Sequence, residues 1–89
     1  MIAAVEELNT ALKDSGAWRC AGGLHPPLTA KTVDASSGDV RVLDEPFVQA
    51  SAYVGGFWVI EAPDEATAIE WAERASRAVR SRVEVRALQ

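Results

Sequence analysis

The chain has 89 residues, of which 48% are apolar and 25% charged, and its formal net charge is −4. This length predicts one small domain over residues 1–89 with a modest core. The balance of apolar and charged residues is that of a folded protein rather than a disordered one. The acidic charge, with no cluster of basic and aromatic residues, argues against direct binding of nucleic acid, whose phosphates require a basic surface.

The single cysteine, Cys20, has no partner for an internal disulfide, which is unusual for a small secreted domain. Glu6 and Glu7 interrupt the start of the chain, so no signal peptide is predicted, and no apolar run is long enough to span a membrane. We therefore expect a cytoplasmic protein with no membrane partner. A metal or other cofactor is not expected, because one histidine and one cysteine without clustered carboxylates give no usual ligand spacing.

In the first third of the chain, residues 2–15 carry apolar side chains at spacings of three and four, which predicts a helix. Gly16 suits the left-handed position just after that helix. Residues 17–24 alternate in polarity and predict a strand that ends at a glycine pair. Pro26 and Pro27 then predict an extended, non-helical stretch, because proline fixes φ and restricts the residue before it.

The middle of the chain predicts a β-hairpin from residues 28–34 and 40–43, with a turn at the Ser-Ser-Gly-Asp sequence between them. A loop over residues 44–56 follows. The strongest predicted strand covers residues 57–62, and Pro63 ends it.

The last part of the chain predicts a helix over residues 65–79, for which Asp64 is a good N-cap. A stripe of small residues on this helix would let it lie close to a sheet; its members are Ala68, Ala72, Ala75 and Val79. Residues 83–88 alternate in polarity and predict a final strand. The order of elements predicts an α+β fold with two helices on one face of a sheet.

The strand at residues 57–60 is apolar on both faces, since Phe57 and Val59 point one way and Trp58 and Ile60 the other. Two helices cover only one of these faces. We therefore expect a homodimer in which a second copy covers the other face by contact between sheets. A protein that stays a well-folded monomer on dilution would contradict this expectation.

Four segments carry a family resemblance: "GGLHPPLTAKTV", "VLDEPF", "GGFWVIEAPDEATAIEWA" and "VEVRAL". They resemble the YCII-related family, and most closely its branch named for an Asp-Gly-Pro-Phe (DGPF) motif. The resemblance runs from about Ala3 to Leu88. It implies a ferredoxin-like α+β fold that dimerises through its sheets, as in dimeric α+β barrel proteins.

The chain departs from this family in two ways. Glu45 stands where the motif has glycine, and the usual first strand, which lies between the strands matching residues 57–62 and 83–88, is absent. Three arrangements follow from the second departure: residues 83–88 pair directly with residues 57–62 as a parallel neighbour, a partner chain lends a strand, or the native protein is longer.

Three residues are candidates for acid/base chemistry. His25 is the only histidine, a residue type suited to general acid/base chemistry at neutral pH, and it lies in a loop shaped by glycine and proline pairs, although such a residue more often hydrogen-bonds backbone. Asp44, which matches the aspartate of the DGPF motif, either orients His25 or caps a turn. Glu61 is either a buried carboxylate with a raised pKa or an exposed residue at the end of its strand.

Three further residues are candidates for ligand binding. Pro46 and Phe47 complete the motif, and Phe47 is expected to plug the gap between loop and sheet rather than to bind a ligand. Tyr53 is the one residue between Phe47 and Gly55 able to exchange a proton, where relatives often carry charged residues. Cys20 is expected to be a small buried residue rather than a nucleophile.

Two functional hypotheses remain. The first is a binding or regulatory module without catalysis; DGPF-type domains are often found near sigma factors or fused to them, so the resemblance implies an accessory role in transcription. The second is a lyase or isomerase acting on a small organic acid, with His25 and Asp44 as the acid/base pair and Glu61 as a second acid or base. The absence of the family's charges between Phe47 and Gly55 favours the first.

Overall fold

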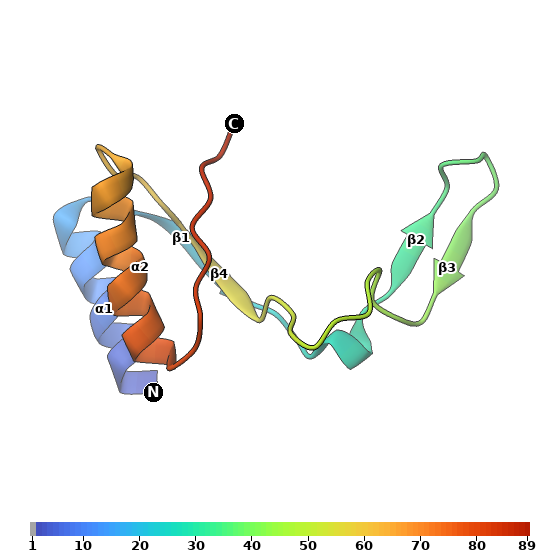
Figure 1. Ribbon diagram of the computed structural model, residues 1–89, viewed down its shortest axis with the longest axis horizontal. Coiled ribbons are helices and arrows are strands. Elements are labelled where there is room, and N and C mark those ends of the chain that lie inside the picture. Colours follow the sequence, from blue (N-terminus) through green and yellow to red (C-terminus); the bar gives the residue numbers. More distant parts are fainter. Residues whose placement is uncertain (1) are drawn as a thin grey trace. The chain divides into compact units, whose positions relative to one another are not determined.

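The computed structural model describes residues 2–89 (Figure 1). The elements in chain order are α1 (Ile2–Ser15), β1 (Trp18–Gly23), the 3-10 helix η1 (Pro27–Thr29), β2 (Thr32–Asp34), β3 (Arg41–Leu43), β4 (Gly56–Ile60) and α2 (Glu65–Val79). The chain is α+β, as the sequence predicts. Its residues form two compact units, one from residues 1–20 and 58–89 and the other from residues 21–57.

α1 ends in a Schellman motif, which explains why Gly16 follows it. Gly16 has a φ of 82°, and its N–H donates to the carbonyl of Lys13, while the N–H of Ala17 donates to the carbonyl of Leu12. These two bonds satisfy carbonyls that the helix end would otherwise leave without partners. The predicted left-handed glycine is therefore confirmed, and it directs the chain into β1.

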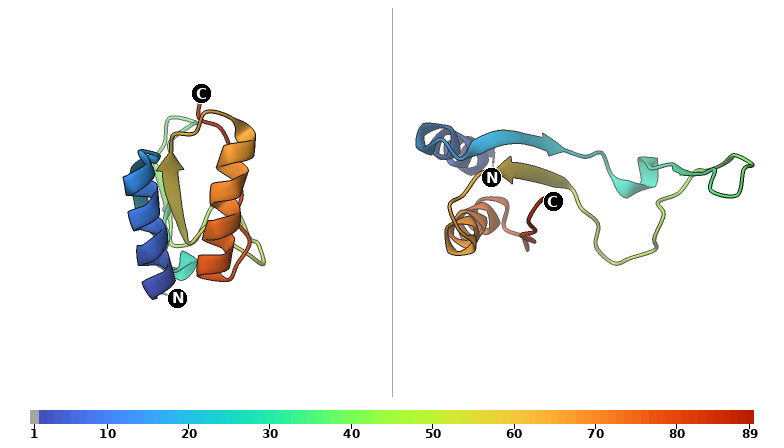
Figure 2. Two further views of the ribbon diagram at one scale, coloured as in Figure 1. Left: turned by 90° about the vertical axis from the view of Figure 1, so that its left-hand side faces the viewer. Right: turned by 90° about the horizontal axis from the view of Figure 1, so that it is seen from above.

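β1 and β4 form a two-stranded sheet. The N–H of Glu61 donates to the carbonyl of Ala17, and at the other end the N–H of Leu24 donates to the carbonyl of Gly55, both at 2.8 Å. The start of one strand thus meets the end of the other, so the pair is antiparallel (Figure 2).

α2 begins and ends as predicted, at Glu65 and Val79. Asp64 is its N-cap, with a side-chain oxygen that accepts a hydrogen bond of 2.8 Å from the N–H of Thr67. The C-cap is Arg80, a non-glycine residue in the left-handed conformation with a φ of 54°. The two helices pack against each other and run in opposite directions (Figure 1).

The buried core lies in the unit formed by residues 1–20 and 58–89. Its members come from both helices and the start of β1: Leu8, Leu12, Ala17, Ala75 and Ala78. Partly buried Trp18, Trp58, Ile60 and Trp71 pack against it. Trp58 and Ile60 therefore lie on the face of β4 that packs against the helices, while Phe57 is 46% exposed.

The unit formed by residues 21–57 contains the predicted hairpin. β2 and β3 pair antiparallel, with Thr32 opposite Leu43, Val33 opposite Val42 and Asp34 opposite Arg41. The predicted extended stretch at the prolines is wrong in part. Pro26 is extended, but Pro27 opens the short helix η1, since proline suits the first helical position, where its missing N–H costs nothing.

The predicted last strand is not formed. Residues 82–89 carry no regular secondary structure, and the sheets of the described chain are β1–β4 and β2–β3 only. Direct parallel pairing of residues 83–88 with residues 57–62 is therefore wrong for this structure. Alternation in polarity makes a segment suited to a strand, but a strand also needs a neighbour that supplies hydrogen bonds. No helix among residues 2–89 is both long and apolar enough to cross a membrane.

Candidate functional site

The turn after β3 is fixed to the start of β2 by two polar contacts. The Lys31 ammonium lies 2.6 Å from Asp44 Oδ1, and the Thr32 hydroxyl donates to the carbonyl of Glu45 at 2.7 Å. Both side chains of the ion pair are exposed to water, at 62% and 84%. Asp44 therefore has the geometry of a turn residue held by a basic neighbour.

His25 lies between β1 and η1 and is exposed. Among residues 2–89, the structure gives its side chain no hydrogen bond and no ion pair, whereas Asp44 is bound to Lys31. An orienting contact between Asp44 and His25 is thus not formed.

The loop between β3 and β4 is closed by Tyr53. Its hydroxyl donates to the carbonyl of Val48 at 2.9 Å and accepts from the N–H of Ala50 at 3.0 Å. Phe47, by contrast, is 87% exposed, so the expectation that it plugs a gap between loop and sheet is wrong. Pro46 beside it is half-buried. The role of Tyr53 that the structure displays is to shape the loop.

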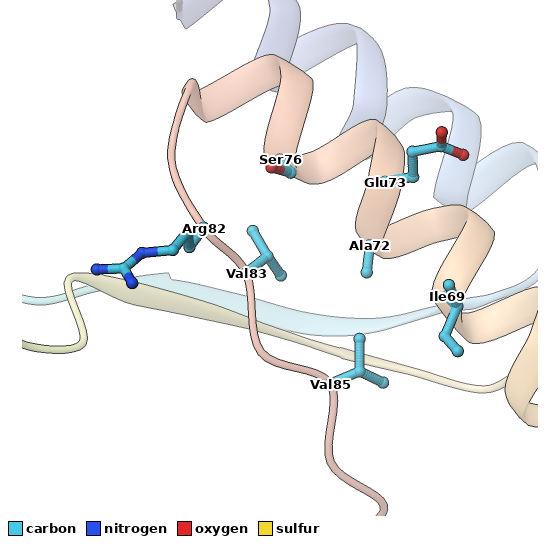
Figure 3. Close-up of a pocket in the computed structure, with 7 residues that line it drawn as sticks. All are labelled: Ile69, Ala72, Glu73, Ser76, Arg82, Val83 and Val85. Carbon is cyan, nitrogen blue, oxygen red and sulfur yellow. The ribbon is translucent and has the colours of Figure 1, made fainter.

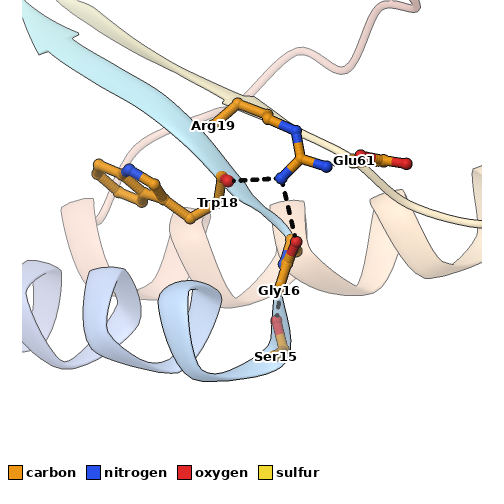
Figure 4. Close-up of polar contacts among 6 residues, drawn as sticks. Ser15, Gly16, Trp18, Arg19 and Glu61 are labelled. Atoms are coloured by element: carbon orange, nitrogen blue, oxygen red, sulfur yellow. Dashed lines mark hydrogen bonds and ion pairs between the residues drawn. The ribbon is translucent and has the colours of Figure 1, made fainter.

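Glu61 follows β4 and pairs with Arg19 of β1 (Figure 4). The same guanidinium donates to the carbonyls of Gly16 and Trp18, at 3.2 and 2.8 Å. The Glu61 side chain is 67% exposed, so the buried alternative is wrong and this carboxylate is a hydrated partner of an arginine. Glu61 and Arg19 together tie the end of β4 to the turn after α1.

The acid/base candidates do not lie in one unit. His25 and Asp44 belong to residues 21–57, and Glu61 belongs to the unit that contains the helices. A site made by all three residues therefore stays a prediction. Cys20 is exposed, which corrects the expectation that it is buried. No group of three metal-ligating side chains occurs in the part of the chain that the structure describes.

Two carboxylates have a pKa below the ordinary value of 3.8. Hydrogen bonds from the side chain and then the backbone of Ser36 lower the pKa of Asp34, and the corresponding bonds from Thr67 lower the pKa of Asp64. Both act as caps of local structure, because each accepts from the residue two or three positions further on.

A groove that sequence reasoning missed lies between α2 and the C-terminal segment (Figure 3). It is open, measures about 530 Å³, and is lined by Ile69, Ala72, Glu73, Ser76, Arg82, Val83 and Val85. Ile69 is 51% exposed and Val85 is 45% exposed, so the apolar part of the lining is in contact with water. The available signal was the presence of Ile69 on α2, outside the predicted stripe of small residues.

Residues 2–89 thus combine two α-helices with small antiparallel sheets and polar contacts that stabilise turns. The family model for the YCII-related domain matches residues 1–89 of the sequence, so the chain belongs to the YCII-related family. The architecture is consistent with a ferredoxin-like α+β fold. No curated protein sequence matches the chain significantly.

Proposed function

We propose that this protein is a non-catalytic binding or regulatory module of the DGPF type, which works as a homodimer in the cytoplasm. The observation that carries the proposal is the uneven distribution of apolar burial. All five buried apolar residues belong to the unit with the helices, whereas residues 21–57 contribute none. Large apolar side chains of that second unit are instead exposed, among them Leu28 at 85%, Phe47 at 87% and Val54 at 70%.

A contiguous exposed apolar patch is a feature of proteins that associate. Val33 and Val42 face each other across β2 and β3, and both are more than half exposed. An isolated two-stranded hairpin is marginally stable in water, so a surface that covers these valines would stabilise it. A second copy that contacts the sheets, as in dimeric α+β barrels, supplies such a cover.

The acidic candidates also support a module rather than an enzyme. Asp44 and Glu61 are each exposed and each paired with a basic side chain, Lys31 and Arg19. Each carboxylate is therefore already engaged with a cation at the surface, where an ion pair stabilises local structure only weakly. The alternative, a lyase or isomerase acting on a small organic acid through His25 and Asp44, gains no contact that supports it. An accessory role in transcription, beside a sigma factor, rests on the resemblance to DGPF-type domains.

The association is tested by sedimentation equilibrium over a dilution series. We expect a dimer that dissociates when Val59, on the strand face opposite Trp58 and Ile60, is replaced by lysine. Ile2→Lys is the matched control, because Ile2 is 73% exposed on α1, outside the sheets. A wild-type chain that remains a folded monomer at all concentrations would contradict the proposal.

A further inference from the structure

The chain passes between its two units twice, once after residue 20, in β1, and once after residue 57, in β4. Two glycines stand just inside residues 21–57 at each of these crossings. They are Gly22 and Gly23 at the end of β1, and Gly55 and Gly56 at the start of β4. Glycine weakens a strand, so four glycines at one level of a two-stranded sheet require an explanation.

Close packing explains two of the four, Gly22 and Gly56. A Cβ added to Gly56 would lie 2.9 Å from the carbonyl oxygen of Gly22, and one added to Gly22 would lie 3.1 Å from the ring of Phe57. Side chains at these positions would push the strands apart or displace the aromatic ring. These two glycines therefore keep β1 and β4 close together.

The other two, Gly23 and Gly55, have no such reason. A Cβ added to either would meet no atom within 4 Å, and neither residue has a positive φ. Neither the available space nor the backbone conformation requires glycine there. What glycine supplies at both positions is a wider range of φ and ψ than any other residue allows.

Gly23 and Gly55 also lie at the same level of the two strands. The N–H of Leu24 donates to the carbonyl of Gly55 at 2.8 Å, so Leu24 and Gly55 lie opposite each other, with Gly23 next to them. A bend at Gly23 is therefore matched by a bend at Gly55, on one line across both strands. Bending about this line moves residues 24–54 out of the plane of the strands without pulling one strand past the other.

The pairing of β1 with β4 is also irregular. The stretch from Ala17 to Leu24 is one residue longer than the stretch from Gly55 to Glu61 opposite it, although hydrogen bonds join both ends. Regular antiparallel pairing cannot run through both bonds, so β1 contains one residue in excess, as in a β-bulge. A bulge interrupts the ladder, which leaves fewer hydrogen bonds to oppose bending.

Residues 24–54 contribute no side chain to the hydrophobic core. The residues that form the core, and those that pack against it, all belong to residues 1–20 and 58–89. Contacts within residues 24–54 hold that segment together, among them the pairing of β2 with β3 and the ion pair of Lys31 with Asp44. A segment that is held by its own contacts, and not by the core, is suited to move as one body.

We propose that Gly23 and Gly55 form a hinge about which residues 24–54 move as one body relative to the unit with the helices. Hinges are commonly a few positions at the ends of elements, which absorb the change in φ and ψ. This inference goes beyond the proposed function, because it concerns a single chain and needs no partner. The motion carries the exposed side chains of Leu28 and Phe47, so the hinge sets where these apolar groups meet another molecule.

The test measures the distance between two spin labels by pulsed electron paramagnetic resonance. Cys20, which is exposed and is the only cysteine, carries one label, and Ser37→Cys in the turn between β2 and β3 carries the other. The labelled chain is mixed with an excess of unlabelled Cys20→Ser chain, so that the measured distances lie within one chain. We expect a broad distribution of distances when both hinge glycines are present.

A second pair of labels tests whether residues 24–54 move as one body. His25→Cys and Ser37→Cys, in a chain that also carries Cys20→Ser, place both labels at exposed positions within this segment. We expect a narrow distribution of distances for this pair, since both labels then move together.

Substitutions at the hinge give a graded test. Gly23→Ala with Gly55→Ala is expected to narrow the distribution between positions 20 and 37 by about 1.5-fold, and the two corresponding valines by about twofold, because β-branched residues favour extended strand conformations. An added Cβ has space at both positions, so the alanine pair carries the test if the valine pair does not fold. The matched control is Ala35→Val with Ala52→Val, at exposed positions of the same segment, and is expected to leave the width unchanged.

Four outcomes contradict the inference. They are a narrow distribution between positions 20 and 37 with both glycines present, no narrowing in the hinge variants, equal narrowing in the control, and a broad distribution between positions 25 and 37. A broad first distribution that narrows only in the hinge variants, with a narrow second one, supports it.

Discussion

The indole N–H of Trp58 donates a hydrogen bond of 2.8 Å to Oδ1 of Asn9, and so links β4 directly to α1. The two residues are 49 positions apart in the sequence, and both are half-buried. Trp58 lies beside the core, and this bond gives its indole N–H an acceptor in place of water. It also fixes which way the indole ring lies beneath the helices.

Replacing Asn9 by alanine is expected to destabilise the protein by about 1–2 kcal/mol, because the Trp58 N–H is then left partly buried without an acceptor. Urea unfolding measures the loss as a lower midpoint. Thr10→Ala on the exposed side of α1 is the control and is expected to change stability by less than about 0.5 kcal/mol. Equal effects of the two substitutions would mean that the bond does not stabilise the fold.

Replacing each of two adjacent glycines by alanine is expected to change the stability of the protein by very different amounts. A Cβ added to Gly56 would lie 2.9 Å from the carbonyl oxygen of Gly22, whereas one added to Gly55 meets no atom within 4 Å. Gly56→Ala therefore forces the backbones of β1 and β4 apart and is expected to cost about 1–3 kcal/mol. Gly55→Ala is expected to be neutral or slightly stabilising, because it restricts the unfolded chain. Thermal unfolding of the two variants tests this, and a stable Gly56→Ala protein would contradict the close approach.

Arg80 holds a backbone conformation that favours glycine. Its φ of 54° places it in the left-handed region, at a cost of about 1–2 kcal/mol for a residue with a Cβ. Arg80→Gly is expected to stabilise the protein by about 1 kcal/mol, a rise in Tm of about 4–8 °C for a domain of this size.

The same substitution at Arg77 serves as the control for Arg80. Arg77 lies inside α2 and pairs with Glu73, so Arg77→Gly is expected to lower stability by about 1 kcal/mol. Changes of the same sign at both positions would show that glycine acts there through something other than helix conformation.

Stability is expected to fall in acid through Asp64. Hydrogen bonds from Thr67 hold the pKa of Asp64 below 3.8 in the folded protein, so the folded state binds fewer protons than the unfolded state near that pH. The contribution of Asp64 is therefore complete above the unfolded pKa and is lost as the pH falls through the lower, folded pKa.

This assignment is tested by comparing the free energy of unfolding of the Asp64→Asn variant at pH 7 and at pH 3. Asparagine keeps an acceptor for the N–H of Thr67 but does not titrate, so the loss of stability in acid should be smaller than in the wild-type chain. An unchanged loss would place the acid sensitivity at other carboxylates.

The parts of the fold that local chemistry determines could be predicted from the sequence. The start of α2 follows from Asp64, whose side chain caps the helix, although β4 ends at Ile60 rather than at the predicted residue 62. Gly16 marks the end of α1 for the same kind of reason, and the hairpin of β2 and β3 follows from its turn residues. In each case the deciding contacts lie within a few positions of the chain.

Features that depend on distant neighbours could not be predicted. The alternation in residues 83–88 does not say whether a strand lies beside them, and here none does. Whether Phe47 and Cys20 are buried depends on whether distant parts of the chain pack over them. Their residue types predicted burial, but both side chains are exposed. In the candidate site, Glu61 could be singled out by its residue type, but only the structure shows that its carboxylate pairs with Arg19.

The two ends of α2 are capped in different ways. Its first turn is secured by the Asp64 cap, while its last turn ends at a strained arginine. An unwinding from Val79 backward would relax Arg80 and release the backbone that leads to Val83, at the loss of the hydrogen bonds that Arg80 and Ser81 donate to the carbonyl of Ser76. Ala78, one of the few buried side chains, lies in that last turn. Opening of this last turn would therefore expose part of the core to solvent.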